Sequence, residues 1–186
     1  MCEERDYLST MRFRLHLVDH SEDVANALQS AFAPYADVEV KCADLLAEAH
    51  DTVVSPANSA GFMDGGIDAA YVRAFGCSIE TEIRRRVSWL PGGLPVGGSL
   101  CVSVQHERVQ RLIVAPTMEH PESVPAINAR RAMAAILRRA SEEHVQDLFC
   151  PGLCTGVGQV DPAEAAEQMR LAYETWASRQ NKAEPT

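Results

Sequence analysis

Hydrophobic and polar side chains alternate along residues 12–17, RFRLHL, with the period of two that is typical of a β-strand with one covered face. The residues before it, 1–10, have no such pattern, and we expect a flexible or loosely docked N-terminal arm there. Beyond the strand, the apolar spacing becomes helical after Ser21, an expected N-cap, and stops at Pro34. The patterned part of the chain therefore begins with a strand followed by a crossover helix.

The same change between strand and helix spacing continues through the rest of the chain. Apolar runs predict further strands at residues 38–42, 52–55, 100–105, 112–115 and 145–150. Helical spacing predicts helices at residues 45–49, 67–75, 78–89, 123–140 and 161–176, with Ser123 and Asp161 as caps of the last two. Strands that alternate with amphipathic helices predict an α/β fold, a three-layer α/β/α sandwich with a mixed, largely parallel central sheet. We place this single domain at residues 11–178 and expect residues 179–186 to fray.

One stretch, residues 51–76, combines a strand, a loop of small residues and a helix in DTVVSPANSAGFMDGGIDAAYVRAFG. Pro56 ends the strand, and Gly76 is well placed to close the helix. The loop between them favours turns and positive φ angles, so its backbone can approach a ligand and direct N–H groups at it. A strand, glycine loop and helix in this order can hold an anion. The same spacing also fits a loop that binds nothing.

A second glycine loop follows the apolar run at residues 145–150, in the sequence PGLCTGVGQVDP. Gly152, Gly156 and Gly158 again free the backbone for close approach, and another helix follows. Each loop comes after a strand and before a helix. The two could therefore face each other at the carboxyl edge of one sheet, where open α/β folds bind their ligands.

Together, these two loops resemble the macrodomain family. The first loop is similar to the family's apolar strand, Ala-Asn step, glycine-rich bend and helix in VVSPANSAGFMDGGIDAAY, and CPGLCTGVGQV looks like its diphosphate loop. The resemblance runs from about Val38 to about Trp176. It implies a macrodomain-like fold and, as partner, ADP-ribose or an ADP-ribosylated protein or nucleotide, with no cofactor and no metal.

The resemblance also implies which residues bind the ligand. Asp44 matches the family's Asp that accepts the adenine amino group, although read by itself it caps the short helix that follows. The other implied ligand-binding positions are Asn58, Asp64, Gly65, Gly66, Ile67, Gly152, Thr155, Gly156, Val157 and Gly158. The diphosphate is expected between the backbones of the two glycine loops.

Asn58 and one further residue, Asp68, resemble catalytic residues of hydrolytic macrodomains of the MacroD type. The resemblance implies that Asn58 contacts the distal ribose and that Asp68, ten positions later, helps to activate water. The alternative for Asp68 is a carboxylate that complements the dipole at the helix N-terminus. Three departures weaken the catalytic interpretation: Met63 and Asp64 stand where glycine is frequent, Gly158 and Gln159 replace an aromatic residue, and Ser55 replaces an Asn.

Three functions therefore remain open: an ADP-ribosyl hydrolase, a non-catalytic ADP-ribose reader, and an α/β protein without a nucleotide ligand. In the hydrolase, Asp64 would place a negative charge near the phosphates, which lowers affinity unless the side chain turns outward.

Amino-acid composition limits the classes of molecule that the protein is expected to bind. The 186 residues carry a formal net charge of -9, which argues against binding of nucleic-acid polymers through phosphate neutralisation. The four arginines at positions 130, 131, 138 and 139 are therefore interpreted as a solvated helix face. Six cysteines without a CxxC pair indicate reduced thiols, and six histidines fall in no metal-ligand spacing. No signal-peptide pattern and no run of 18 apolar residues is present, so we expect a soluble, cytoplasmic protein that does not bind membranes.

Overall fold

The alternating residues near the N-terminus form β1, Arg14–Asp19, in the interior of a six-stranded sheet. The computed structural model describes residues 13–182, so the predicted arm at 1–10 and the strand position Arg12 lie outside the described part. The other strands are β2 (Val38–Cys42), β3 (Asp51–Ser55), β4 (Leu100–Ser103), β5 (Val109–Val114) and β6 (Asp147–Cys150). Their order is β2-β1-β6-β3-β5-β4, and only the β4–β5 pair is antiparallel. The predicted mixed, largely parallel sheet is confirmed.

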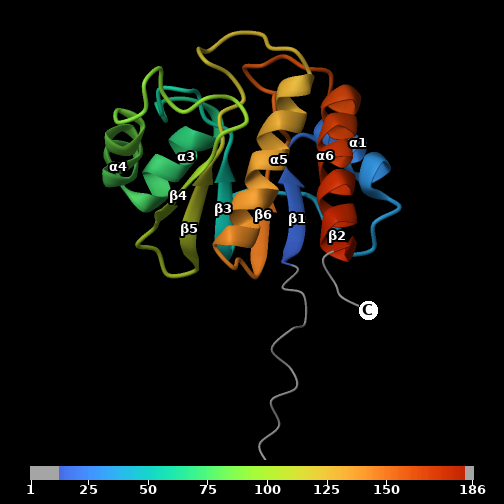
Figure 1. Cartoon of the computed structure of the whole chain (residues 1–186). Helices are drawn as coiled ribbons and strands as arrows, with labels where there is room; N and C mark the ends of the chain where they lie inside the picture. The colour runs from blue at the N-terminus through green and yellow to red at the C-terminus, as the bar shows by residue number, and fades with distance from the viewer. Residues whose placement is uncertain (1–12, 183–186) are drawn as a thin grey trace, which may run out of the picture.

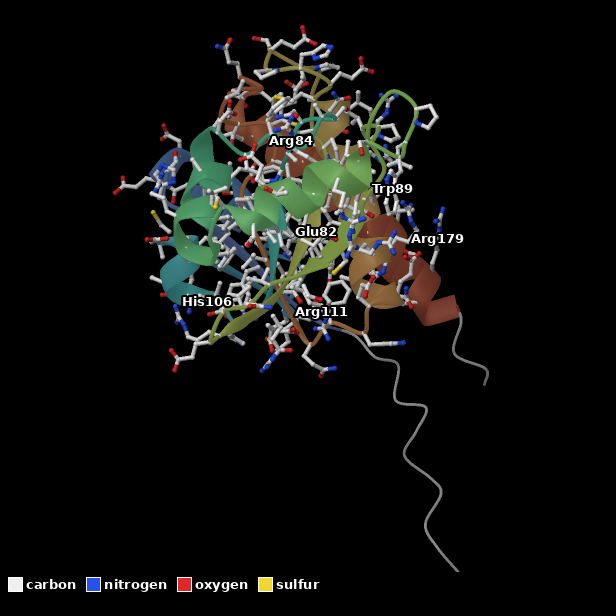
Figure 2. All side chains as sticks on the ribbon, turned by 90° about the vertical axis from the view of Figure 1, so that its left-hand side faces the viewer. Glu82, Arg84, Trp89, His106, Arg111 and Arg179 are labelled. Carbon is white, nitrogen blue, oxygen red and sulfur yellow. The ribbon has the colours of Figure 1, made fainter. Side chains whose placement is uncertain are left out.

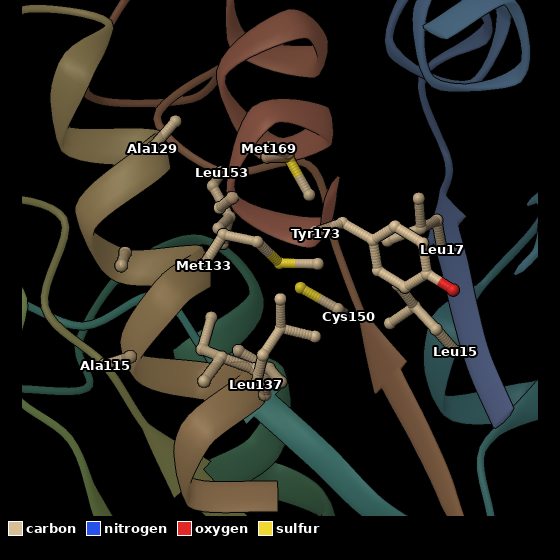
Figure 3. Packing of buried hydrophobic residues seen from close by; sticks show 14 of the residues in the cluster. Leu15, Leu17, Ala115, Ala129, Met133, Leu137, Cys150, Leu153, Met169 and Tyr173 are labelled. Carbon is tan, nitrogen blue, oxygen red and sulfur yellow. The ribbon is translucent and has the colours of Figure 1, made fainter. Parts of the chain in front are cut away.

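Helices cover both faces of this sheet, which makes the predicted three layers (Figure 1). They are α1 (Glu22–Phe32), α2 (Leu45–Glu48), α3 (Gly66–Phe75), α4 (Ser78–Val87), α5 (Ile127–Glu142) and α6 (Pro162–Lys182). The face under α1, α5 and α6 holds the larger core, in which Met133, Tyr173 and Leu17 turn toward one space (Figure 3). Side chains of α2, α3 and α4 pack on the other face with alternate residues of the same strands, because neighbouring strand residues point to opposite sides.

The long helix begins later than predicted. Ser123 was expected to cap it, but α5 starts at Ile127, so this prediction is wrong. Pro125 disfavours the helical conformation for the residue before it, and the chain stays irregular over residues 123–125. Ser123 Oγ instead donates to Gln159 Oε1 at 2.8 Å, and the Val124 amide donates to the Gly158 carbonyl at 3.0 Å. The segment before α5 is therefore tied to the second glycine loop.

The last helix has the predicted start and a longer end. Asp161 Oδ1 accepts hydrogen bonds from the amides of Ala163 at 2.9 Å and Glu164 at 3.1 Å, which confirms Asp161 as the cap. The helix then continues to Lys182, past the point where fraying was expected to begin, and residues 183–186 lie outside the described part. Within residues 13–182, no helix combines the length and the apolar character needed to cross a membrane.

Candidate functional site

The two glycine loops emerge side by side. β3 and β6 are parallel neighbours, with Thr52 opposite Leu148 and Val53 opposite Phe149. Their carboxyl ends therefore lie at the same edge of the sheet, and the loops that follow them, residues 56–65 and 151–161, begin next to each other. This confirms the expectation that the loops meet at the carboxyl edge.

Asp19, at the end of β1, holds the second loop in position. Its Oδ2 accepts from the Gly152 amide at 3.0 Å, and its Oδ1 accepts from the Ser21 amide at 3.0 Å. Its carbonyl also accepts from the Ala43 amide at 3.0 Å. This role of Asp19 was not predicted, although a carboxylate between an apolar strand and a helix start is a sequence signal for such a junction. Ser21 precedes α1 as expected, but its side chain makes no capping hydrogen bond.

Glycines of the second loop serve two different purposes. A Cβ on Gly152 would lie 2.4 Å from Val24 Cγ1, and one on Gly158 would lie 2.6 Å from the Cys154 carbonyl oxygen. These two glycines allow the loop to pack closely. A Cβ on Gly156, in contrast, would meet no atom within 4 Å. Gly156 and the 55% exposed Val157 therefore border open space, and Thr155 beside them is half-buried.

The first loop presents similar open backbone at the start of α3. A Cβ on Gly65 or Gly66 would also meet no atom within 4 Å, and Gly66 has a φ of +53°. Both residues are exposed, as is Asp64, whereas Ile67 is half-buried against the core. Exposed amides at a helix N-terminus attract anions. This end of α3 is therefore open to a ligand.

Asp68 is buried beneath this open backbone. It is the third residue of α3 and only 8% exposed, and its Oδ1 has no hydrogen-bond partner among the described residues. Burial raises the pKa of Asp68 to about 6; the nearby Ser55 hydroxyl lowers this pKa and the charge of Asp64 raises it further. A carboxyl group with this pKa exchanges protons near neutral pH. It is therefore chemically suited to acid–base catalysis.

Asn58 is largely committed to the shape of its own loop. Its Oδ1 accepts from the amides of Ala60 at 3.1 Å and Phe62 at 3.3 Å, and its Nδ2 donates to the Phe62 carbonyl at 3.0 Å. An amide nitrogen carries two protons, so one N–H of Nδ2 remains for a ligand. The hydrogen bonds by which Asn58 holds its own loop were not predictable from the sequence.

Tyr71 of α3 anchors the helix to strand β3 of the sheet. Its hydroxyl donates to the Val54 carbonyl at 2.9 Å, and burial raises its pKa well above the ordinary range. The charges of Asp68 and Asp44 both raise that pKa further, so both carboxylates lie near it. Asp44 itself is exposed and caps α2, with Oδ1 accepting from the Leu46 amide at 2.9 Å. Its other oxygen, Oδ2, accepts no hydrogen bond from residues 13–182.

A groove of about 990 Å³ lies on the other side of the first loop, against α4. Phe62 lines this groove, and the Arg84 guanidinium lies 4.2 Å from the centre of the Phe62 ring. Glu82 and Arg84 both project outward from α4 (Figure 2). Ser59 and Ala60 also line this groove, but no residue of the second loop does. The groove is therefore separate from the space between the two glycine loops.

The cysteines of the second loop do not form a metal site. Burial raises the pKa of Cys154 to about 12 and raises that of Cys150 as well, so both remain thiols. Among the residues that the structure describes, no group of three His, Cys, Asp or Glu side chains is arranged to hold a metal ion.

The comparisons with known proteins agree with this geometry. The Macro domain family model matches residues 54–169. The chain is 37% identical over 134 residues to an uncharacterised protein of Aeropyrum pernix, covering 72% of this chain and 68% of that one. It is 30% identical over 138 residues to the macro domain-containing protein SCO6450 of Streptomyces coelicolor, covering 73% and 79%.

Two solved structures share this fold. The macrodomain of Mycobacterium tuberculosis DarG superposes with a TM-score of 0.64 at 19% identity, over 72% of this chain and 87% of that one. Thermosipho africanus DarTG in complex with ADP-ribose superposes with a TM-score of 0.61 at 15% identity, over 87% and 50%. The family model spans more than half of the sequence, and the two loops it includes are those that meet at the sheet edge. This chain belongs to the Macro domain family.

Proposed function

We propose that this protein binds ADP-ribose between its two glycine loops and hydrolyses the bond that joins ADP-ribose to a modified protein side chain or nucleotide. The observation that carries the proposal is Asp68, a buried carboxyl group in the first turn of the helix that follows the open glycine loop, with a pKa of about 6 and an oxygen that has no hydrogen-bond partner in the described part of the chain. A purely structural carboxylate at a helix N-terminus is normally solvated or bonded to backbone amides.

Binding rests on the exposed backbone of both loops. The diphosphate lies between the amides of residues 65–67 and those of residues 155–158, where Gly65, Gly66 and Gly156 leave open space. The adenine end lies by Asp44, whose free Oδ2 accepts the amino group. Thermosipho africanus DarTG was solved with ADP-ribose and the Trypanosoma brucei macrodomain with ADP, which supports a ligand of this class.

The chemistry follows from the protonation state of Asp68. With a pKa of about 6, its carboxyl group is mostly ionised at pH 7.5 and accepts a proton from a water molecule as the water oxygen attacks the anomeric carbon of the distal ribose. The bond from that carbon to the acceptor breaks, the acceptor keeps its electron pair, and the proton taken up by Asp68 passes on to the acceptor, which regenerates the carboxylate. The remaining N–H of Asn58 orients the ribose during this step.

The proposal is tested by titrating ADP-ribose into the protein and then assaying release of ADP-ribose from acidic side chains and from nucleotides. We expect Asp68→Asn to bind ADP-ribose with nearly unchanged affinity and to lose about 100-fold or more of the hydrolysis rate, as expected for loss of an acid–base group. Asp37→Asn, a change of the same kind just before β2, at the opposite edge of the sheet from the glycine loops, serves as the control. A wild-type protein that binds but releases nothing contradicts hydrolysis.

A non-catalytic reader is the second candidate, and one observation favours it. The side chain of Asn58 makes three hydrogen bonds within its own loop, which leaves little freedom to follow a ribose through a reaction. In a reader, ADP-ribose binds and Asp68→Asn changes neither affinity nor any turnover.

A further inference from the structure

The groove against α4 shares the first glycine loop with the expected ribose site. Ser59, Ala60 and Phe62 of this loop line the groove. The Asn58 side chain, which we expect to orient the distal ribose, donates from Nδ2 to the Phe62 carbonyl at 3.0 Å and accepts at Oδ1 from the Phe62 amide at 3.3 Å. The side chain expected at the ribose is thus bonded directly to a residue of the groove. With ADP-ribose bound as proposed, the acceptor joined to its distal ribose lies next to this groove.

The loop after α4 is fixed to the first glycine loop before any partner binds. The Leu94 amide donates to the Ser59 carbonyl at 2.9 Å, and the Gly93 amide donates to the Leu90 carbonyl at 2.9 Å. A Cβ on Gly93 would lie 2.4 Å from the Ser59 carbonyl oxygen, and Gly93 has a φ of +85°, so glycine is needed for this contact. Because these walls of the groove are already joined, a partner does not have to order them when it binds.

Exposed apolar side chains and arginines line the groove. Phe62 is 42% exposed and Leu90 is 41% exposed. Arg84 lies over the Phe62 ring, and the Arg85 guanidinium lies 4.7 Å from the centre of the Trp89 ring, which is 70% exposed (Figure 2). Aromatic residues and arginine are enriched at protein–protein interfaces and among the residues that contribute most to binding. The side chains of the groove therefore suit a polypeptide.

The charges in the groove favour a polypeptide over a nucleic acid. Arg85 is paired with Glu82 at 2.8 Å, whereas Arg84 forms no ion pair with any described residue. Glu80 and Glu119 also line the groove and form no ion pair within residues 13–182. A nucleic-acid strand brings only negative phosphates, which the two glutamates repel. A polypeptide can place a carboxylate beside the arginine and a lysine beside the glutamates.

We propose that this groove binds the polypeptide segment around the modified side chain, so that the acceptor of ADP-ribose is a protein. This inference rests on the proposed binding of ADP-ribose between the glycine loops and does not depend on hydrolysis. The segment places an apolar side chain against Phe62 and Leu90, a carboxylate beside Arg84 and a cationic side chain beside Glu119. The glycine loops bind the ADP-ribose group, and the groove selects the protein sequence around it.

The test measures the binding of three probes by calorimetric titration. They are free ADP-ribose, a synthetic peptide that carries ADP-ribose on a glutamine side chain flanked by leucine, glutamate and lysine, and a single-stranded oligonucleotide that carries ADP-ribose on one base. The amide linkage of the peptide is chosen because it resists release. We expect the peptide to bind about tenfold more tightly than free ADP-ribose, because contacts in the groove add to those of the loops. The oligonucleotide should bind no more tightly than free ADP-ribose.

Two variants locate the peptide on the surface. We expect Arg84→Glu to weaken peptide binding about fivefold or more and Leu90→Ser to weaken it as well, while both keep the wild-type affinity for free ADP-ribose, which also shows that they are folded. A peptide with lysine in place of its flanking glutamate should bind Arg84→Glu more tightly than the original peptide does. Arg179→Glu, the same change of charge at an exposed position of α6 on the opposite face of the sheet, is the control and should change neither affinity.

The outcomes separate this inference from the proposed function. A peptide that binds no more tightly than free ADP-ribose overturns the docking of a polypeptide and leaves ADP-ribose binding in place. Tighter binding of the oligonucleotide, or peptide binding that neither groove variant weakens, also overturns the inference. A wild type that binds none of the three probes overturns the proposed function and the groove together. A protein that binds the peptide tightly but releases ADP-ribose from no substrate contradicts hydrolysis alone.

Discussion

The Asp19 carboxylate and the Gly152 amide join the end of β1 to the second glycine loop through a hydrogen bond of 3.0 Å. Because the same carboxylate also accepts from the Ser21 amide, one side chain fixes both the start of α1 and the entry to the loop. We expect Asp19→Ala to lower the free energy of unfolding by about 1–3 kcal/mol, since two partly buried amides lose their acceptor.

The same variant should also weaken ADP-ribose binding, because the loop amides lose their fixed direction. Urea unfolding and calorimetric titration measure the two effects. Asp19→Asn keeps one acceptor oxygen and should be intermediate. Unchanged affinity in a destabilised Asp19→Ala would mean that the loop is held by other contacts.

The raised pKa of Asp68 predicts an inverse relation between stability and activity. The pKa of Asp68 is about 6 in the folded protein and has its ordinary value of 3.8 in the unfolded chain. The contribution of the protonated Asp68 to the free energy of unfolding is therefore complete below pH 3.8 and is lost as the pH rises through 6. The loss amounts to about 3 kcal/mol, from 1.36 kcal/mol for each pKa unit. We therefore expect Asp68→Asn to be more stable than the wild type at pH 8 and nearly equal to it at pH 4.

Unfolding by urea at pH 4, 6 and 8 measures this difference. If Asp68→Asn is instead less stable at pH 8 by about 0.5 to 1 kcal/mol, the carboxylate acts mainly on the helix dipole.

Asp64 influences both binding and the proton affinity of Asp68. Its charge raises the Asp68 pKa, and it is exposed in the loop where we place the diphosphate. We expect Asp64→Asn to lower that pKa and to strengthen ADP-ribose binding about two- to fivefold, because a like charge is removed from the anion's surroundings. The gain should shrink in high salt, since exposed charges are screened. An affinity that does not change at low salt would indicate that Asp64 points away from the ligand.

Gly156 and Gly158 should respond in opposite ways to substitution. Gly156 borders open space, so Gly156→Glu should leave the melting temperature nearly unchanged and abolish ADP-ribose binding by filling that space with a charged side chain. Gly158→Ala brings a Cβ within 2.6 Å of the Cys154 carbonyl oxygen and should destabilise the fold by about 1–3 kcal/mol. Thermal unfolding and calorimetric titration of both variants check this contrast. Retained binding in Gly156→Glu would put the diphosphate elsewhere.

The sequence predicted the elements around the site better than the contacts within it. Alternation and helical spacing placed strand β3, helix α3 and the second loop correctly, because each pattern reports which side chains a local element can bury. The order of the strands was not predictable from these local patterns. Only the sheet brings β6 between β1 and β3 and so places the two loops together.

Several misses involve side chains whose contacts depend on distant segments of the chain. Ser123 has the composition of a helix cap, yet Gln159 takes its hydroxyl. Asp68 of α3 is buried although it is charged, whereas the apolar Ala74 on the same helix is exposed. Asp68 was expected at the helix N-terminus, but its burial beside Ser55 depends on how α3 lies on the sheet. Such contacts have no signal in the spacing of a single sequence.

The pairing of β3 with β6 has a consequence for motion. These two strands share two registered residue pairs, fewer than any other neighbouring strands of the described sheet. A ligand bound by the loops that follow both strands contacts both sides of this short strand pair and stabilises the pairing while it is bound. Amide hydrogen exchange of Val53 and Leu148 should therefore slow when ADP-ribose binds, while exchange in the outer β4–β5 pair stays unchanged. Ligand binding at the edge of the sheet would thus reduce local opening between its two central strands.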